Sequence, residues 1–157
     1  MRDPINVAVA VIFGTGEHEG RLFYQQRPLD ALRPGMWEHP GGKLERGEDV
    51  RAAAEREVLE ELGCRVAIGE IIASALLDLY EYSIVLTAVQ AGFLDAKPPR
   101  ALLGQLGFRW ASPQYAIDHM PCSPGTYLLH RAVMQWMRHG IKRSHGSVDV
   151  PLDGGVR

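Results

Sequence analysis

A helix-forming stretch with a dense group of glutamates most constrains how this 157-residue chain can fold. Residues from Asp49 to Leu62 include no glycine or proline, and most of them are strong helix formers. Gly63 follows at a position that favours the end of a helix, and Pro40-Gly41-Gly42 begins a loop that continues through Gly47. We therefore predict a helix over residues 49–62 that follows a glycine-rich loop.

Three carboxylates on the predicted helix share one face. At 100° per residue, Glu57, Glu60 and Glu61 fall within an arc of about 100°. Crowded carboxylates raise each other's pKa, whereas a hard divalent cation that prefers oxygen ligands keeps them ionised. A glutamate-rich helix is often only a solvated face, but here Gly41 and Gly42 let backbone groups approach a ligand closely. We therefore interpret this face as a metal site, with Mg²⁺ as the natural occupant.

The segment from Gly42 to Cys64 resembles the signature of the Nudix hydrolase superfamily. That signature specifies glycine, five residues, glutamate, seven residues, arginine-glutamate, an aliphatic residue, any residue, glutamate-glutamate, any residue, glycine and an aliphatic residue. Eight of the nine specified positions match, and Cys64 replaces the final aliphatic residue. The resemblance implies an α/β (α+β) fold, in which a mixed β-sheet is sandwiched between helices, and an enzyme that hydrolyses phosphoanhydride bonds.

The resemblance also implies a metal-dependent reaction in which water attacks a phosphorus atom of a diphosphate linkage. The metal ligands would be the carbonyl oxygen of Gly41 and the carboxylates of Glu57, Glu60 and Glu61. Mg²⁺ is the expected cofactor, with Mn²⁺ as an alternative. The catalytic residues that the resemblance implies are Glu48, Arg56, Glu57, Glu60 and Glu61.

The resemblance implies separate roles for two of these residues. Glu48 would be either a further carboxylate of the metal site or a proton acceptor, and Arg56 would orient the neighbouring carboxylates. Lys43, in the loop before the helix, would contact a phosphate or the leaving group.

Residues outside the signature are similar to those of the MutT branch, which hydrolyses nucleoside triphosphates to monophosphates and diphosphate. The branch usually has Trp-Glu-Phe-Pro-Gly-Gly-Lys where this chain has the segment from Trp37 to Lys43, so that His39 replaces an aromatic residue. The resemblance extends from about Asn6 to Trp110. The substrate contacts that we expect are Arg27, Trp37, His39, Lys43 and Ser123.

Two positions depart from the branch. Leu103 aligns with a glutamate that contributes to the metal site in the branch, and Gln105 and Asp95 are the nearest substitutes. Enzymes specific for oxidised guanine nucleotides have an asparagine near the start of the last helix that recognises the base, and the nearest residue in this chain is Ser123. Because a hydroxyl has one donor and cannot pair in a bidentate manner, we do not expect oxidised-guanine specificity.

These departures keep two alternatives open. Tyr80 lies 17 residues after Gly63, a separation similar to that in the dinucleoside polyphosphate branch, so hydrolysis of a dinucleoside polyphosphate or a nucleotide sugar is one alternative. The other is a non-catalytic domain that only binds a nucleotide, which Leu103 would explain. The intact helix carboxylates argue against that second alternative, because binding alone does not require so many like charges in one place.

Apolar runs and turn residues predict the remaining elements. Residues from Gly14 to Gly20 are rich in turn formers, so we predict that the first two strands form a hairpin. The expected strands cover residues 7–13, 21–26, 36–39, 65–77, 80–90 and 108–111.

A second helix is expected near the C-terminus of the chain. Ser123 offers an N-cap, Pro124 suits the first helical position, and the helix should reach about Arg138. We therefore expect a single domain over residues 1–140 and a flexible tail over residues 141–157.

Charge and cysteine content limit the expected partners. The formal net charge of −2 and the pI near 6.3 provide no basic field for a nucleic acid polymer, so a small-molecule nucleotide is the expected partner. Cys64 and Cys122 form no Cys-x-x-Cys pair, which suits a reducing cytosol. The longest apolar run, Val7 to Phe13, is too short to span a bilayer. We therefore expect a cytoplasmic enzyme without membrane association, as a monomer or a homodimer.

Overall fold

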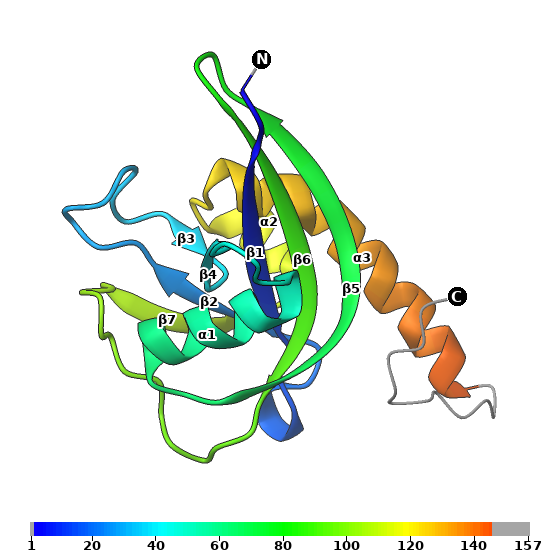
Figure 1. The fold of residues 1–157 in the computed structure, drawn as a ribbon. Coiled ribbons are helices and arrows are strands. Elements are labelled where there is room, and N and C mark those ends of the chain that lie inside the picture. The colour runs from blue at the N-terminus through cyan, green and yellow to red at the C-terminus, as the bar shows by residue number, and fades with distance from the viewer. Residues whose placement is uncertain (1, 146–157) are drawn as a thin grey trace.

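Residues 2–145 are described by the computed structural model, in which two β-sheets and the helices around them make up the fold (Figure 1). The elements in chain order are β1 (Ile5–Ile12), η1 (Gly16–His18), β2 (Leu22–Gln26), β3 (Trp37–Glu38), β4 (Gly41–Lys43), α1 (Val50–Leu62), β5 (Val66–Asp78), β6 (Ser83–Phe93), β7 (Gly107–Ala111), α2 (Pro113–His119) and α3 (Pro124–His145).

The strands form one mixed sheet and one antiparallel sheet. The larger sheet has the order β4-β1-β6-β5, and β1 runs parallel to β6 but antiparallel to β4. The smaller sheet has the order β3-β2-β7 with antiparallel neighbours. Helix α1 packs on one side of the larger sheet and α3 on the other (Figure 1). The predicted mixed sheet between helices is confirmed.

Strand β1 contributes to the core on both of its faces, because successive side chains of a strand point in opposite directions. Ala8, Ala10 and Ile12 are buried in the cluster that includes the apolar side of α1. Val9 and Val11 belong to the cluster on the α3 side. A strand that is covered on both faces is expected to be apolar, as β1 is from Val7 to Ile12.

Helix α1 begins and ends where the sequence predicted. The Asp49 side chain accepts a hydrogen bond from the backbone N–H of Ala52 at 2.8 Å, and Gly63 adopts a left-handed conformation with φ of 67° at the C-cap. The small residues Ala53 and Ala54 are buried against the sheet, which brings α1 close to β1 and β4. The prediction of this helix is confirmed.

The predicted hairpin of the first two strands is wrong. Strand β1 pairs with β4 and β6, whereas β2 belongs to the smaller sheet, and a single bridge between Phe13 and Leu22 joins the two where they diverge. The connection contains the 3-10 turn η1, so the chain leaves β1 before it enters β2. Both edges of β1 therefore pair within the larger sheet, one with β4 and the other with β6.

The segment from Gly41 to Lys43, which was predicted as loop, forms strand β4. Its register places Gly41 opposite Val9 and Gly42 opposite Ala8. A Cβ atom on Gly41 would overlap the carbonyl oxygen of Ala8, so glycine is required for this close pairing. Strand β4 in turn delivers the two glycines to the face on which α1 lies.

The helices after β7 differ in part from the prediction. Helix α2 was not predicted, although Ser112 caps it by accepting a hydrogen bond from Tyr115 N–H at 3.2 Å. Helix α3 begins at Pro124 as predicted but continues to His145, beyond the expected end at Arg138. The first residues of the predicted tail are therefore helical, and residues 146–157 lie outside the described residues.

In the described part of the chain, no helix is both long enough and apolar enough to cross a membrane.

Candidate active site

Arg56 on α1 contacts a group of three glutamates. Its Nε and Nη2 atoms donate to the two carboxylate oxygens of Glu48, each at 2.8 Å. Its Nη1 atom donates to Glu57 at 2.7 Å and to Glu60 at 3.3 Å, and Nη2 also donates to the carbonyl oxygen of Lys43 at 3.0 Å. One guanidinium therefore fixes the loop after β4 relative to two turns of α1.

These contacts determine the ionisation of Glu48. The hydrogen bonds from Arg56, followed by one from the Glu45 backbone N–H at 3.0 Å, lower the pKa of Glu48 to about 2. Glu48 is thus ionised at neutral pH, and the same carboxylate raises the pKa of the Arg56 guanidinium.

Glu61 lies on the same helix but in the interior, with 8% of its surface exposed. Its Oε2 atom accepts hydrogen bonds from the Gly41 backbone N–H and from Gln25 Nε2, each at 3.2 Å. Burial raises the pKa of Glu61 to about 8, with further increases from the charges of Glu57 and Glu38. The groups that hold Glu61 are neutral donors, so the carboxyl is largely protonated at neutral pH when no cation is bound, and a bound cation would favour its ionised form.

The glycines of β4 make room for these carboxylates. A Cβ atom on Gly42 would overlap the carboxylate of Glu57, which lies directly against the backbone of β4. The neighbouring residue, Gly41, donates its N–H to Glu61. The backbone of β4 thus lies beside both carboxylates, and no side chain separates them from it.

The chemistry of this donor set fits a hard divalent cation, because carboxylate and carbonyl oxygens are the ligands that such a cation prefers. The charge of Glu57 helps to raise the pKa of Glu61, and a cation bound near both groups would favour the ionised form of Glu61. Within the described part of the chain, no three histidine, cysteine, aspartate or glutamate side chains are arranged to hold a metal ion as they stand.

The predicted catalytic residues are brought together by the fold. Glu48, Glu57 and Glu60 contact Arg56, and Glu61 contacts the glycine strand. Glu60 is the most accessible of the helix carboxylates that contact Arg56, with 53% of its side chain exposed, compared with 15% for Glu57. The site therefore combines one open carboxylate with two that are enclosed.

The predicted substrate contacts lie at several places around the site. Arg27 donates from Nη1 to Glu38 at 2.8 Å and from Nε to the Leu32 carbonyl oxygen at 2.6 Å. Burial raises the pKa of Glu38, an effect that the nearby Arg27 opposes. Lys43 has an exposed side chain next to the Arg56 network.

Trp37 and Ser123 lie together on the α3 side of the smaller sheet. The Ser123 backbone N–H donates to the Trp37 carbonyl oxygen at 2.9 Å. The Ser123 hydroxyl lies 2.9 Å from the Thr126 hydroxyl in the first turn of α3. Trp37 is half-buried and packs against the core cluster under α3.

His39 has a different place from the predicted one. It is 4% exposed, its Nδ1 atom lies 3.1 Å from the Phe23 carbonyl oxygen, and its ring packs on Tyr24 at 4.6 Å between centroids. Burial, with a contribution from His130, lowers the pKa of His39 to about 3. The prediction that His39 contacts the substrate is corrected, because the ring is neutral and enclosed by the core.

The two candidate substitutes for the missing glutamate are far from equivalent. Asp95 forms an exposed ion pair with Arg65 at 2.9 Å. Gln105 is buried, and its Nε2 atom donates to the Glu61 carbonyl oxygen at 2.9 Å and to Gln25 Oε1 at 3.2 Å. Leu103, at the aligned position, is 57% exposed. Gln105 therefore occupies the place next to the site.

Two residues beside Glu61 were not predicted, namely Gln25 and Glu38. They lie opposite each other on β2 and β3, which puts their side chains on one face of the smaller sheet. The alternation along β2 was a signal for this placement, since Tyr24 faces the α3 side and Gln25 must then face the other way.

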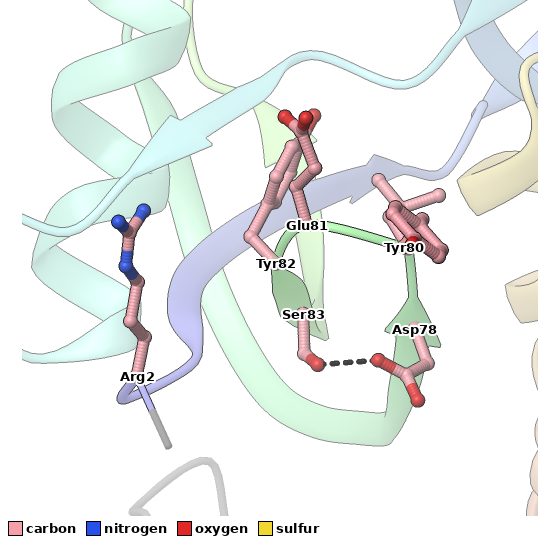
Figure 2. Close-up of a pocket in the computed structure, with 7 residues that line it drawn as sticks. Arg2, Asp78, Tyr80, Glu81, Tyr82 and Ser83 are labelled. Atoms are coloured by element: carbon pink, nitrogen blue, oxygen red, sulfur yellow. Dashed lines mark hydrogen bonds between the residues drawn. The ribbon is translucent and has the colours of Figure 1, made fainter.

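An open recess of about 680 Å³ lies away from these residues, at the turn between β5 and β6 (Figure 2). Tyr80 is fully exposed at this turn, and the Ser83 hydroxyl donates to Asp78 at 2.6 Å. The recess contains none of the predicted catalytic residues. Its lining residues are Arg2, Asp78, Leu79, Tyr80, Glu81, Tyr82 and Ser83.

Known proteins are similar to this chain in sequence and in structure. The model of the NUDIX domain matches residues 4–114. The CTP pyrophosphohydrolase of Escherichia coli (strain K12) is 34% identical over 134 residues, which cover 83% of this chain and 91% of that protein. The 8-oxo-dGTP diphosphatase of Proteus vulgaris is 34% identical over 83 residues, 53% of this chain and 71% of that protein. The solution structure of the E. coli ORF135 protein superimposes with a TM-score of 0.71 at 28% identity, covering 93% of this chain and 96% of that one.

Proposed function

The chain belongs to the NUDIX family of hydrolases, and from that premise we propose that it converts a nucleoside triphosphate to a nucleoside monophosphate and diphosphate, with Mg²⁺ as the cofactor. Hydrolysis of phosphoanhydride bonds is the activity of the family to which it belongs. The observation that carries the proposal is the convergence of Glu48, Glu57 and Glu60 on Arg56, beside the buried Glu61 and the glycines of β4.

The proposed metal ligands are the Gly41 carbonyl oxygen and the carboxylates of Glu57, Glu60 and Glu61. A bound divalent cation supplies charge neutralisation at the phosphates and activates water. Mg²⁺ is proposed because all the donors are oxygen atoms, and Mn²⁺ is expected to substitute for it. Gln25 and the Gly41 N–H support this assignment by holding one oxygen of Glu61 in place.

Glu48 and Arg56 have distinct proposed roles. Since the pKa of Glu48 is about 2 while Arg56 holds both of its oxygens, Glu48 is a weak proton acceptor. We therefore favour a role for Glu48 in shaping the metal site over a role as general base. Arg56 orients Glu48 and Glu57, and its hydrogen bonds lower the pKa of Glu48 and keep that carboxylate ionised.

Nucleotide contacts are proposed for four residues around the site. Lys43 is exposed next to the catalytic residues and suits a phosphate. Arg27, on the rim of the smaller sheet, also suits a phosphate or ribose oxygen. Trp37 and Ser123, joined by a backbone hydrogen bond, are proposed to lie beside the base.

The preferred substrate is proposed to be a nucleoside triphosphate with an unmodified base. The similarity to the CTP pyrophosphohydrolase over most of both chains supports this class and makes CTP the first candidate. Ser123 supplies a hydroxyl where oxidised-guanine recognition would need an amide. The small net charge of −2 supports a free nucleotide over a nucleic acid polymer.

Tyr80 supports a second candidate function, hydrolysis of a dinucleoside polyphosphate or a nucleotide sugar. The side chain is fully exposed at the turn between β5 and β6, where it is available to stack on a base. This candidate predicts that such substrates are preferred to every triphosphate. The third alternative, a domain that only binds a nucleotide, predicts binding without turnover.

A substrate panel with separate detection of monophosphate, diphosphate and orthophosphate tests the proposal. We expect Mg²⁺-dependent release of diphosphate from CTP or another triphosphate, and loss of turnover in Glu61→Gln. Release of single orthophosphate, or turnover that Glu61→Gln leaves unchanged, would contradict it. Size-exclusion chromatography and cell fractionation test the accompanying proposals of a monomer or homodimer in the cytoplasm.

A further inference from the structure

We propose that Gln25 and Gln105 form an amide relay that positions the carboxylate of Glu61 for cation binding. The inference rests on the proposed metal-dependent hydrolysis. It concerns two neutral side chains that lie outside the segment from Gly42 to Cys64. They come from different elements, β2 and the loop before β7, and meet at the C-terminal end of α1.

The relay is a continuous set of hydrogen bonds. The Leu103 backbone N–H donates to Gln105 Oε1 at 2.9 Å, and Gln105 Nε2 donates to Gln25 Oε1 at 3.2 Å. Gln25 Nε2 then donates to Glu61 Oε2 at 3.2 Å. Gln105 Nε2 donates in addition to the Glu61 carbonyl oxygen at 2.9 Å, so both ends of residue Glu61 are held.

The direction of the relay is fixed at the end where the Leu103 N–H contacts Gln105. A backbone N–H only donates, so Gln105 must turn Oε1 toward Leu103 and Nε2 toward Gln25. Because Gln105 Nε2 donates to Gln25 Oε1, Gln25 turns its other side-chain atom, Nε2, toward Glu61 Oε2. Each amide therefore has one orientation that satisfies all its contacts.

Burial makes these contacts important. Gln25 is 3% exposed and Gln105 is 8% exposed, so water cannot replace the lost partner of a broken bond at low cost. The relay and the Gly41 N–H both donate to Oε2 of Glu61. The other oxygen, Oε1, is then the one that would be left to bind a cation.

The relay also closes the loop between β6 and β7 against α1. The Arg100 backbone N–H donates to the Leu62 carbonyl oxygen at 2.9 Å, and the Leu102 N–H donates to that of Glu61 at 3.3 Å. Gln105 adds the side-chain contact to the same carbonyl oxygen. The loop thereby satisfies carbonyl groups that the end of a helix leaves without partners.

An amide and a carboxylate have opposite effects at position 105. The two groups that Gln105 Nε2 contacts, Gln25 Oε1 and the Glu61 carbonyl oxygen, are both acceptors. A carboxylate there has no proton to donate and adds a negative charge beside Glu61. If Gln105 were only a substitute for an acidic metal ligand, Gln105→Glu would strengthen cation binding; the relay requires that it weaken binding.

Mn²⁺ binding without nucleotide, followed by electron paramagnetic resonance of the free ion, measures this directly. We expect Gln105→Leu and Gln105→Glu to weaken the Mn²⁺ affinity by about 10-fold or more. With triphosphate as substrate and the cation saturating, kcat falls by about 10- to 100-fold while KM changes little. Tighter Mn²⁺ binding by Gln105→Glu, or an unchanged affinity in folded Gln105→Leu, overturns the proposal.

Gln90→Leu is the matched control, because Gln90 on β6 contacts the Glu70 N–H at 3.5 Å and lies outside the relay. Its Mn²⁺ affinity should stay within about 2-fold of the original, well below the 10-fold effect expected at position 105.

A measurement on the unchanged protein covers the case in which Gln105→Leu does not fold. We expect addition of Mg²⁺ to shift the side-chain NH₂ signals of Gln25 and Gln105 in NMR spectra and to leave those of Gln90 in place. Unshifted signals for the two relay residues at saturating Mg²⁺ overturn the relay. If the protein binds Mn²⁺ but cleaves no triphosphate, the proposed function fails, and the Mn²⁺ affinities still decide the relay.

Discussion

Arg56 shows how one residue organises a site made of like charges. Its guanidinium contacts Glu48 through two oxygens, Glu57 at 2.7 Å and Glu60 at 3.3 Å, and Glu45 lies 3.8 Å away. A planar fork with five N–H donors matches this geometry, whereas a point charge does not. The position of these carboxylates therefore depends on the shape of the arginine as well as on its charge.

Replacing Arg56 by lysine separates shape from charge. We expect Arg56→Lys to lower kcat by about 10- to 100-fold, because lysine cannot bind both oxygens of Glu48 and still reach Glu57. Steady-state kinetics and thermal melting measure the effect. Arg65→Lys, in the exposed pair with Asp95, is the control and should retain full activity. Equal kcat for Arg56→Lys and the original protein would refute the role of the fork.

Gly42 is the residue at which a single methyl group should reach the site. A Cβ atom on Gly42 meets the carboxylate of Glu57, a flexible group that can move aside, so Gly42→Ala should fold normally. The displaced Glu57 should reduce kcat by about 10-fold or more. Gly92→Ala is the control, since a Cβ on Gly92 has no atom within 4 Å. Similar kinetics for the two variants would show that Glu57 need not lie against β4.

At the scale of elements, α1 is defined by its two caps. Asp49 accepts the Ala52 N–H at the N-terminus, and Gly63 provides the left-handed residue at the C-terminus. Asp49→Ala should lower the free energy of unfolding by about 1 kcal/mol, while Asp49→Asn should retain most of it, because both aspartate and asparagine accept this hydrogen bond. Urea denaturation of the three proteins is the measurement. Equal losses for alanine and asparagine would mean that the cap hydrogen bond contributes nothing.

The elements that the sequence predicted were those specified locally. Helix α1 has its caps, its helix formers and its glycine stop within one continuous segment. The partner of β1 was mispredicted because pairing is decided by distant strands, here β4 and β6, which turn signals between neighbours do not reveal. Strand β4 was missed because Gly41 and Gly42 favour a turn unless a close partner strand fixes them.

The residues of the candidate site also form two groups, one that is specified by local sequence and one that depends on tertiary packing. Glu48, Arg56, Glu57, Glu60 and Glu61 belong to one loop and one helix, so their spacing alone predicted that they would meet. The contacts of Glu61 with Gln25 and Gln105 join residues 36 and 44 positions apart, and only the packing of α1 on both sheets brings them together. His39 was misassigned because its neighbours along the chain form the site, while its ring faces the opposite side of the sheet.

At the scale of the whole molecule, a buried polar group joins the smaller sheet to α3. The Tyr24 hydroxyl lies 3.0 Å from His130 Nε2, and the Tyr24 ring packs on His39. Among the described residues, His39 Nε2 and His130 Nδ1 are buried without a hydrogen-bond partner. Burial lowers the pKa of His39 to about 3 and that of His130 to about 4, so both rings are neutral in the fold.

These lowered pKa values give the stability a defined dependence on pH. In the unfolded chain both histidines bind a proton near pH 6.5, whereas in the fold they bind one only near pH 3 to 4. The stability that these two histidines contribute is therefore complete above about pH 6.5 and decreases as the pH falls toward their folded pKa values. Each ring contributes a slope of about 1.4 kcal/mol per pH unit in that interval. Glu61 contributes in the opposite direction, because its pKa is raised in the fold.

The variant His39→Phe isolates one histidine from these opposing contributions. The difference in unfolding free energy between variant and original protein cancels Glu61 and His130, and leaves the titration of His39. We expect the variant to gain stability relative to the original as the pH falls, by about 1.4 kcal/mol per unit between pH 6 and pH 4. Removal of the unpaired Nε2 atom should offset the loss of the contact with Phe23 at pH 7.5. Urea denaturation of both proteins in metal-free buffer at pH 4, 5, 6 and 7.5 measures this difference. Parallel curves for the two proteins would mean that His39 is protonated in the fold or accessible to water.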